Sequence, residues 1–154
     1  MGVAEERAHH RRENLGRLLF RSYRAINDRL ISELNSTGFG LRLGHVGVIS
    51  NLEYDGGTRL STLASRAGVT KQAVTPVVRD LEQMGYVDTS TDPTDGRAKL
   101  VSLTPEGRRL IDAAQPLIVA IEGEIGRLLG KRLAELHETL RQLLESLEEG
   151  SPYP

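Results

Sequence analysis

The chain has 154 residues, 38% of them hydrophobic, which fits one compact domain or one domain with a helical extension. It contains no cysteine, so disulfides, thiolate metal sites and thiol-based redox sensing within the chain are excluded. No stretch approaches the roughly 18 apolar residues of a membrane span, and the N-terminus lacks the apolar core of a secretion signal, so a cytoplasmic location is expected.

The first 13 residues are polar and charged. No metal site is expected at His9 and His10, because adjacent residues on a helix point about 100° apart. A long amphipathic helix is predicted next, since apolar residues recur every three or four positions. They are Leu15, Leu19, Tyr23, Ile26, Leu30 and Leu34. The turn-forming residues Asn35–Gly38 predict its end.

A second helix is predicted from Leu43 to Tyr54. Its expected buried edge consists of Val46, Ile49 and Leu52. An Asp-Gly-Gly sequence at residues 55–57 predicts the end of this helix, and residues 58–60 are expected to form a short strand. His45, near the start of the helix, is expected to lie on its surface without a special role. The alternative is a histidine that senses pH or contacts a ligand.

Residues 60–84 predict two short helices joined by a tight turn. The first has an apolar edge made of Leu60, Leu63, Ala64 and Ala67. Ser61 is its predicted N-cap, because a serine hydroxyl can accept from an otherwise orphan amide. Gly68 predicts the turn, since glycine adopts a positive φ at little cost. Thr70 is the predicted N-cap of the second helix.

This second helix has an apolar and a polar arc. The apolar arc is Val74, Val77, Val78, Leu81 and Met84, and the opposite arc is Gln72, Thr75, Pro76, Arg79 and Gln83, with Lys71 in the first turn. Amide, hydroxyl and guanidinium groups are those that reach base edges and phosphates in a major groove. An ordinary amphipathic helix with a solvated face fits the same pattern. Pro76 removes an amide from the helix interior, so a bend is expected, at a cost of about 3 kcal/mol.

A two-stranded hairpin with a charged tip is predicted after residue 84. Residues 85–87 end the helix and begin a strand, residues 92–96 are rich in turn formers, and residues 99–103 return as a second strand. Arg97 lies near the tip, where Asp95 is expected to anchor its guanidinium. The alternative is a pair that only stiffens an exposed turn. A helix–turn–helix followed by such a hairpin is the layout of a winged helix.

Two further helices are predicted in the rest of the chain. Thr104, Pro105 and Glu106 supply a capping hydroxyl, a proline at the first helical position and an acid in the first turn. A heptad rhythm then runs through Ile111, Ala114, Ile118, Ile121, Ile125 and Leu128, with a kink expected at Pro116 and an end at Gly130. The last helix carries Leu133, Leu136, Leu140, Leu143 and Leu147. Such long, narrow apolar stripes need a covering surface, which predicts a dimer, although an intramolecular helical hairpin is the alternative.

The chain resembles the MarR family (multiple antibiotic resistance regulators) of bacterial transcriptional regulators. The matching pieces are LSTLA at residues 60–64, TKQAV at 70–74, LEQMGYV at 81–87 and DPTDGRAKLVSLTPEG at 92–107. The most diagnostic residues are Asp95, Arg97, Leu103 and Thr104. The resemblance covers nearly the whole chain and is weakest before about Leu15. It implies a mainly α fold with a small β-wing. A winged helix–turn–helix at residues 41–104 would lie between dimerisation helices at 1–40 and 105–154, all forming one intertwined domain.

The same resemblance implies a homodimeric, sequence-specific repressor that binds palindromic operator DNA. A small aromatic or phenolic effector between the dimer helices and the DNA-binding lobe would release it, and His45 is the only candidate contact. The expected DNA-binding residues are Ser61, Thr70, Lys71, Gln72, Thr75, Arg79, Asp95, Arg97 and Lys99. The expected dimerisation residues are Leu15, Leu19, Ile111, Ile118, Ile121, Ile125, Leu136, Leu140 and Leu143.

The charge distribution gives modest support to DNA binding. The 20 basic and 21 acidic residues give a net charge of −1, which counts mildly against nucleic acid. Basic residues nevertheless gather between residues 58 and 104, at Arg59, Arg66, Lys71, Arg79, Arg97 and Lys99. A winged-helix module for protein–protein contacts and a small helical enzyme remain alternatives. No phosphate-binding loop, recognisable catalytic triad or HExxH motif is present, so no enzyme activity, cofactor or metal is expected.

Overall fold

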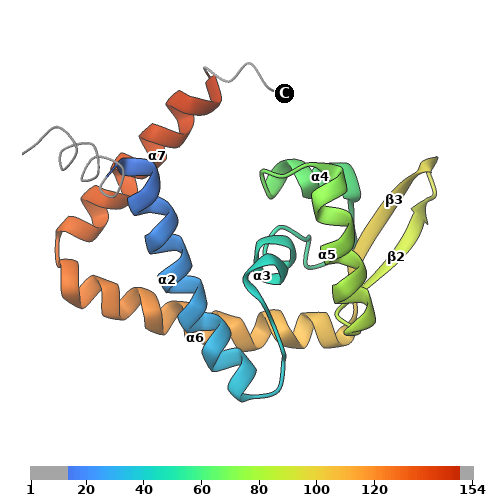
Figure 1. Cartoon of the computed structure of the whole chain (residues 1–154), viewed down its shortest axis with the longest axis horizontal. Coiled ribbons are helices and arrows are strands. Elements are labelled where there is room, and N and C mark those ends of the chain that lie inside the picture. Colours follow the sequence, from blue (N-terminus) through green and yellow to red (C-terminus); the bar gives the residue numbers. More distant parts are fainter. Residues whose placement is uncertain (1–13, 150–154) are drawn as a thin grey trace, which may run out of the picture. The chain divides into compact units, whose positions relative to one another are not determined.

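The computed structural model describes residues 14–149 (Figure 1). The chain forms two units, residues 1–117 and 118–154, with the boundary inside a long helix. Unit 1 contains α2 (Leu15–Ser36), α3 (Leu43–Ile49), β1 (Gly57–Arg59), α4 (Leu60–Arg66), α5 (Lys71–Gln83), β2 (Val87–Asp92), β3 (Asp95–Leu103) and the first part of α6 (Pro105–Leu129). Unit 2 contains the rest of α6 and α7 (Arg132–Glu149). The predicted class, mainly α with a small β-wing, is confirmed.

Helix α2 begins and ends close to where the sequence predicts. Its N-cap is Asn14, whose side chain accepts from the Arg17 amide at 3.0 Å. In its last turn, the Asn35 side chain donates to the Leu41 carbonyl and accepts from the Leu41 amide, at 2.9 and 2.6 Å. This clamp fixes the connection to α3.

Helix α3 is shorter than predicted, because it ends at Ile49 and not near Tyr54. Ser50 and Asn51 donate side-chain hydrogen bonds to the Val46 and Gly47 carbonyls, a local competition that helix-ending residues commonly provide. The chain then turns, and the buried Thr58 hydroxyl accepts from the Glu53 amide at 3.0 Å.

Strand β1 leads directly into α4. The predicted N-cap Ser61 is therefore wrong: the cap position is Arg59, which is extended and makes no capping side-chain bond. Ser61 is an exposed residue of the first helical turn. The sequence pattern missed this because no residue separates the strand from the helix.

Helix α5 has the predicted buried edge of Val74, Val78 and Leu81. Thr70 caps it as expected, accepting from the Ala73 amide at 3.2 Å. The helix continues through Pro76 without interruption from Lys71 to Gln83.

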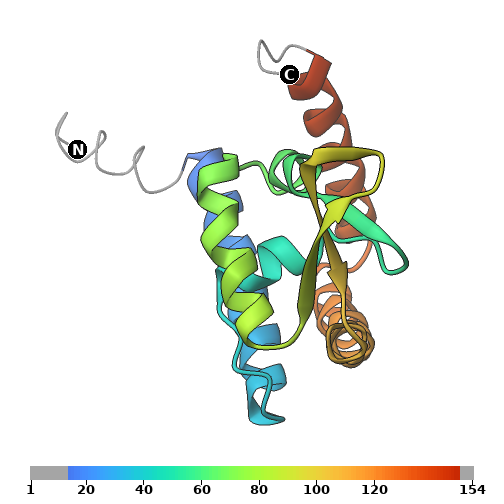
Figure 2. The same cartoon turned by 90° about the vertical axis from the view of Figure 1, so that its right-hand side faces the viewer.

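The sheet is antiparallel with strand order β1-β3-β2. Strand β3 is longer than predicted and begins at Asp95, which pairs with Asp92 across a turn of only two residues. Figure 2 shows the β2–β3 hairpin extending alongside α5. The most deeply buried side chains come from α4, α5, the sheet and the start of α6: Leu63, Val74, Leu81, Val87, Val101 and Leu110.

The start of α6 packs tightly against the end of α5. The Thr104 hydroxyl caps α6 as predicted, accepting from the Gly107 amide at 3.0 Å, and it donates to the Gly85 carbonyl at 2.6 Å. A Cβ atom at Gly107 would lie 2.0 Å from the Tyr86 carbonyl oxygen. The close approach therefore requires glycine at this position.

In unit 2, Gly130 separates the two helices with a φ of +58°, so its predicted role as a helix end is confirmed. Helix α6 continues through Pro116. Several large apolar side chains of this unit are exposed: Ile118, Val119, Leu128, Leu136, Leu144 and Leu147. Within residues 14–149, no helix is long and apolar enough to cross a membrane.

Candidate nucleic-acid interface

Helices α4 and α5 form the predicted helix–turn–helix. Leu63 and Ala64 are the buried residues of α4, and Gly68 makes the turn with a φ of +65°. The Val69 amide donates to the Ala64 carbonyl at 3.0 Å, which closes the end of α4. Because both apolar edges are buried, the polar face of α5 is held outward on a rigid support.

The exposed face of α5 carries Lys71, Gln72 and Arg79. Thr75 is half-buried, and its hydroxyl donates to the Lys71 carbonyl at 2.6 Å. It can still accept a hydrogen bond, but it is less free than the other three. These side chains have the chemistry that reads base edges and binds phosphate.

A shallow groove separates α5 from the sheet. Its lining is Leu60, Thr75, Val78, Arg79, Glu82, Thr89, Lys99 and Val101. The fold thereby brings together Thr75, Arg79 and Lys99, which are far apart in the sequence. Glu82 spans the two elements, because its carboxylate accepts from the Thr89 amide at 3.1 Å and from the Thr89 hydroxyl at 2.6 Å.

At the hairpin tip, Asp95 anchors Arg97 differently from the prediction. Its carboxylate accepts from the main-chain amide of Arg97 at 3.1 Å, and no bond to the guanidinium is present. The expected carboxylate–guanidinium anchor is therefore wrong. The Arg97 side chain is exposed.

The arginines and lysines between residues 42 and 108 fall into two groups. Some are paired with acids: Arg42 with Asp80, Arg59 with Asp92, Arg66 with Glu53, and Arg108 with Asp55. By contrast, Lys71, Arg79, Arg97 and Lys99 form no ion pair with any other residue in the part of the chain that the structure describes. Lys99 makes one long bond, of 3.4 Å, to the Thr91 hydroxyl. Between residues 42 and 108, the cations without an ion pair are those on α5 and the hairpin, so the balanced total charge conceals a basic surface.

A buried carboxylate beneath the tip was not singled out by the sequence. Asp92 is buried, and its Oδ2 accepts from Arg59 Nε at 2.7 Å. Its Oδ1 accepts from the Thr94 hydroxyl at 2.7 Å and from the Thr94 amide at 2.8 Å. The Thr94 bonds, followed by the Arg59 bond, lower the pKa of Asp92 to about 2. The Asp-Pro-Thr sequence signals the local turn, but nothing in it signals the partner 33 residues upstream.

His45 is buried, so its predicted place on the helix surface is wrong. Its Nδ1 accepts from the Arg42 amide at 3.2 Å, which leaves the proton on Nε2, 3.0 Å from Asp80 Oδ2. The Arg42 guanidinium also bonds this carboxylate. Burial, and then the charge of Arg42, lower the pKa of His45. These three residues line a small hollow with Leu43, Gly44, Pro76 and Val77.

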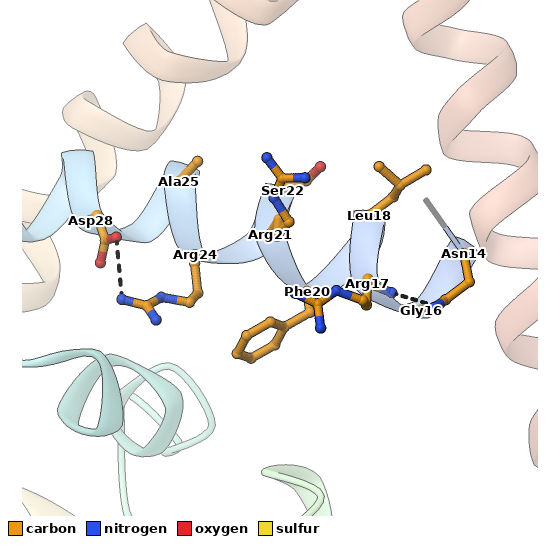
Figure 3. A pocket seen from close by; sticks show the side chains of 10 residues that line it. All are labelled: Asn14, Gly16, Arg17, Leu18, Phe20, Arg21, Ser22, Arg24, Ala25 and Asp28. Carbon is orange, nitrogen blue, oxygen red and sulfur yellow. Dashed lines mark hydrogen bonds and ion pairs between the residues drawn. The ribbon is translucent and has the colours of Figure 1, made fainter. Parts of the chain in front are cut away.

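Another hollow runs along α2, and the described residues that line it come from this helix and its N-cap Asn14 (Figure 3). Its side chains include Phe20, Arg17, Arg21 and Arg24, and Arg24 lies 3.9 Å from Asp28. The apolar residues of the outer part of α2 are exposed: Leu15, Leu18, Leu19, Phe20, Tyr23 and Ile26.

The expected dimerisation residues differ in exposure. Leu15, Leu19, Ile118 and Leu136 are exposed, Ile111, Ile125, Leu140 and Leu143 are half-buried, and Ile121 is buried within the chain. Among the described residues, no group of three acids or histidines is placed to hold a metal ion.

Comparisons with known proteins are consistent with this surface. The sequence model of the MarR family matches residues 42–99. An uncharacterised HTH-type transcriptional regulator of Mycobacterium bovis is 32% identical over 104 residues, which are 68% of each chain. An HTH-type transcriptional repressor of Mycobacterium tuberculosis is 29% identical over 96% of this chain and 98% of its own length. The crystal structure of CouR from Rhodococcus jostii RHA1, bound to p-coumaroyl-CoA, superposes with a TM-score of 0.69 at 28% identity, over 88% of this chain and 92% of CouR.

Proposed function

The chain belongs to the MarR family of transcriptional regulators, and from this premise we propose that it is a homodimeric, cytoplasmic repressor released by a small aromatic effector. The observation that carries the DNA-binding part is the set of unpaired cations on α5 and the hairpin, two of which, Arg79 and Lys99, line the groove between them. Lys71 and Arg79 on α5, and Arg97 and Lys99 on the hairpin, have no acid to neutralise them within the described chain. A polyanion such as duplex DNA is the natural partner of such a surface.

In this proposal α5 lies in a major groove and the hairpin reaches the neighbouring minor groove. Gln72 and Arg79 can form bidentate bonds with base edges, which carry sequence information. Lys71 and Lys99 act mainly through phosphate charge, and Arg97 enters a minor groove, where width and potential matter more than base identity. Ser61, Thr70 and Thr75 supply hydroxyls near the same backbone.

The dimer is proposed because two sets of apolar side chains lack cover within the described chain. One set lies on the outer part of α2, and the other is in unit 2. A dimer of two-fold symmetry would place two copies of α5 on successive turns of DNA, so a palindromic operator is expected.

The repressor and effector parts of the proposal rest on relatives. The M. tuberculosis relative, which is aligned over nearly the whole chain, carries the name of a repressor. CouR, at 28% identity, has been crystallised with p-coumaroyl-CoA, a thioester with a phenolic ring. An aromatic or phenolic effector of this chain is consistent with that neighbour.

The test is a binding titration with duplex DNA from upstream of the protein's own gene, followed by fluorescence anisotropy at several salt concentrations. We expect saturable binding that weakens steeply with salt and exceeds the affinity for a scrambled duplex at least 10³-fold. Equal, weak binding to both duplexes would favour the protein–protein module instead. Addition of phenolic acids and their CoA thioesters to the complex then tests the effector, which should release the DNA.

A further inference from the structure

The tip of the hairpin is the least supported part of the winged helix. Strand β1 pairs with β3 only from Leu100 to Ser102. Nearer the tip, Lys99 and Asp95 pair with β2 alone, and residues 96–98 lie in an irregularity of the ladder between them. A two-stranded ribbon is at best marginally stable by itself. The direction in which Arg97 is presented therefore depends on whatever ties the tip to the rest of the fold.

Arg59 provides such a tie. It is the last residue of β1, and the next residue begins α4, so its backbone is fixed to the helix–turn–helix. Its guanidinium bonds Asp92 through Nε at 2.7 Å and the Thr94 hydroxyl through Nη2 at 3.1 Å. The planar guanidinium can hold two acceptors at once in a fixed geometry, which a lysine cannot.

The chain of contacts continues to the DNA-binding tip. Thr94 donates from its hydroxyl and its amide to the other oxygen of Asp92, and these bonds fix the two-residue turn against the end of β2. The next residue, Asp95, pairs with Asp92 across the strands and accepts from the Arg97 amide. Arg59, Asp92, Thr94 and Asp95 thus form a continuous path between α4 and Arg97, made of hydrogen bonds, the strand pairing of Asp92 with Asp95 and the peptide bond from Thr94 to Asp95.

We propose that Arg59 is a positioning residue for DNA binding, which acts through Asp92 and Thr94 to hold the wing arginine Arg97 in its working orientation. The inference rests on the proposed DNA-binding function and adds a residue to it. Asp92 is a charge of the same sign as DNA at the hairpin tip, and a buried carboxylate is costly to retain without a partner. Its position is explained by the tie to Arg59.

For Asp92→Asn, this role predicts a change in operator affinity opposite in direction to the change that charge alone predicts. Asp92→Asn removes a negative charge close to the DNA, so electrostatics alone predicts tighter binding. If Arg59 contacted a phosphate directly, freeing it from Asp92 would also tighten binding. The positioning role predicts the opposite: operator affinity should fall about tenfold, because the tip and Arg97 lose their fixed orientation.

The experiment measures operator affinity by fluorescence anisotropy for the full chain and its variants. We compare Asp92→Asn, Arg59→Ala and Thr94→Val with Asp55→Asn, a matched control that removes an exposed acid paired with Arg108 outside the interface. Thermal unfolding shows which variants fold. If Asp92→Asn does not fold, Thr94→Val still tests the inference, because Thr94 is exposed and its replacement should leave the fold intact. The three tie variants should bind more weakly than wild type, and the control should bind like wild type.

A double variant separates positioning from general damage. If the path acts through Arg97, then Asp92→Asn should weaken binding in the wild-type chain but have no further effect when Arg97→Ala is already present. Equal or tighter binding by folded Asp92→Asn and Thr94→Val, or full additivity with Arg97→Ala, would overturn the inference and leave the proposed function standing. Failure of the wild-type chain to bind any operator would instead overturn the proposed function.

Discussion

Helices α5 and α2 are both amphipathic, but within residues 14–149 only α5 has its apolar side covered. Val74, Val78 and Leu81 of α5 are almost fully buried, so its polar face is left as the outer surface. In α2, Leu30 and Leu34 are buried, whereas the apolar residues from Leu15 to Ile26 are exposed. The same sequence periodicity thus has two outcomes: α5 offers a polar face to a partner, and α2 an apolar one.

The largest expected effect comes from the buried side of α5. Leu81 has no exposed surface, so Leu81→Ala should lower the free energy of unfolding by about 2–5 kcal/mol. Urea denaturation followed by circular dichroism measures this. Leu18→Ala on α2 is the matched control, because 41% of Leu18 is exposed and its loss should cost much less in a monomer. Equal losses at low protein concentration would remove the distinction between the two helices.

The second effect concerns the apolar face of α2. Replacing Leu15 and Leu19 together with lysine should leave the fold intact but weaken dimerisation at least 100-fold, since charges would be buried at the contact. Sedimentation equilibrium should show wild-type dimer and variant monomer at micromolar concentration. The same change at exposed polar positions of α2, Ser22 and Ser32, serves as a control for added charge. A wild-type monomer would mean that α2 has no self-complementary face.

The third effect sharpens the description of the polar face. Arg97→Ala should weaken binding to every operator variant and reduce the salt-dependence slope by about one phosphate-equivalent. Gln72→Ala should instead relax the preference at one or two base pairs, each worth about 1–3 kcal/mol. Binding titrations with single-base operator variants at several salt concentrations distinguish the two. Identical profiles for both variants would show that α5 and the wing do not read DNA in different ways.

The smallest effect concerns His45, which packs between α3 and α5. Because its pKa is lowered in the folded chain, the unfolded chain binds more protons below about pH 6.5. The contribution of His45 to the free energy of unfolding should therefore be fully present above that pH and decline as the pH falls towards the pKa of His45 in the folded chain. The check is urea denaturation between pH 7.5 and 5.5, with His45→Gln as a non-titrating control. If the stability of the wild type and of His45→Gln changed equally with pH, His45 would not have a lowered pKa in the folded chain.

Local patterns predicted most of the fold because the responsible interactions are short-range. The caps at Thr70 and Thr104, the turn at Gly68 and the apolar edge of α5 all depend on residues within four positions. The errors at Ser61 and at the end of α3 also arose locally, where a strand runs directly into a helix and where side chains compete for helix carbonyls.

The candidate site was predicted only in part. The exposed residues of α5 follow from periodicity, but the Arg59–Asp92 and His45–Asp80 contacts join residues more than 30 positions apart. Periodicity carries no information on such pairs. It also gave His45 a surface position, although α5 covers it, because His45 does not belong to the apolar edge of Val46, Ile49 and Leu52 that the pattern defines.

The most direct test is a hydroxyl-radical footprint of the wild-type chain and Arg97→Ala on the operator. The account predicts two equivalent protected regions about one helical turn of DNA apart, one for each α5 of a dimer, flanked by protected minor grooves. Arg97→Ala should lose the flanking protection and keep the central pattern. A single asymmetric footprint, or flanking protection that Arg97→Ala leaves unchanged, would contradict the assignment of α5 and the wing to DNA and of the apolar faces to a second copy.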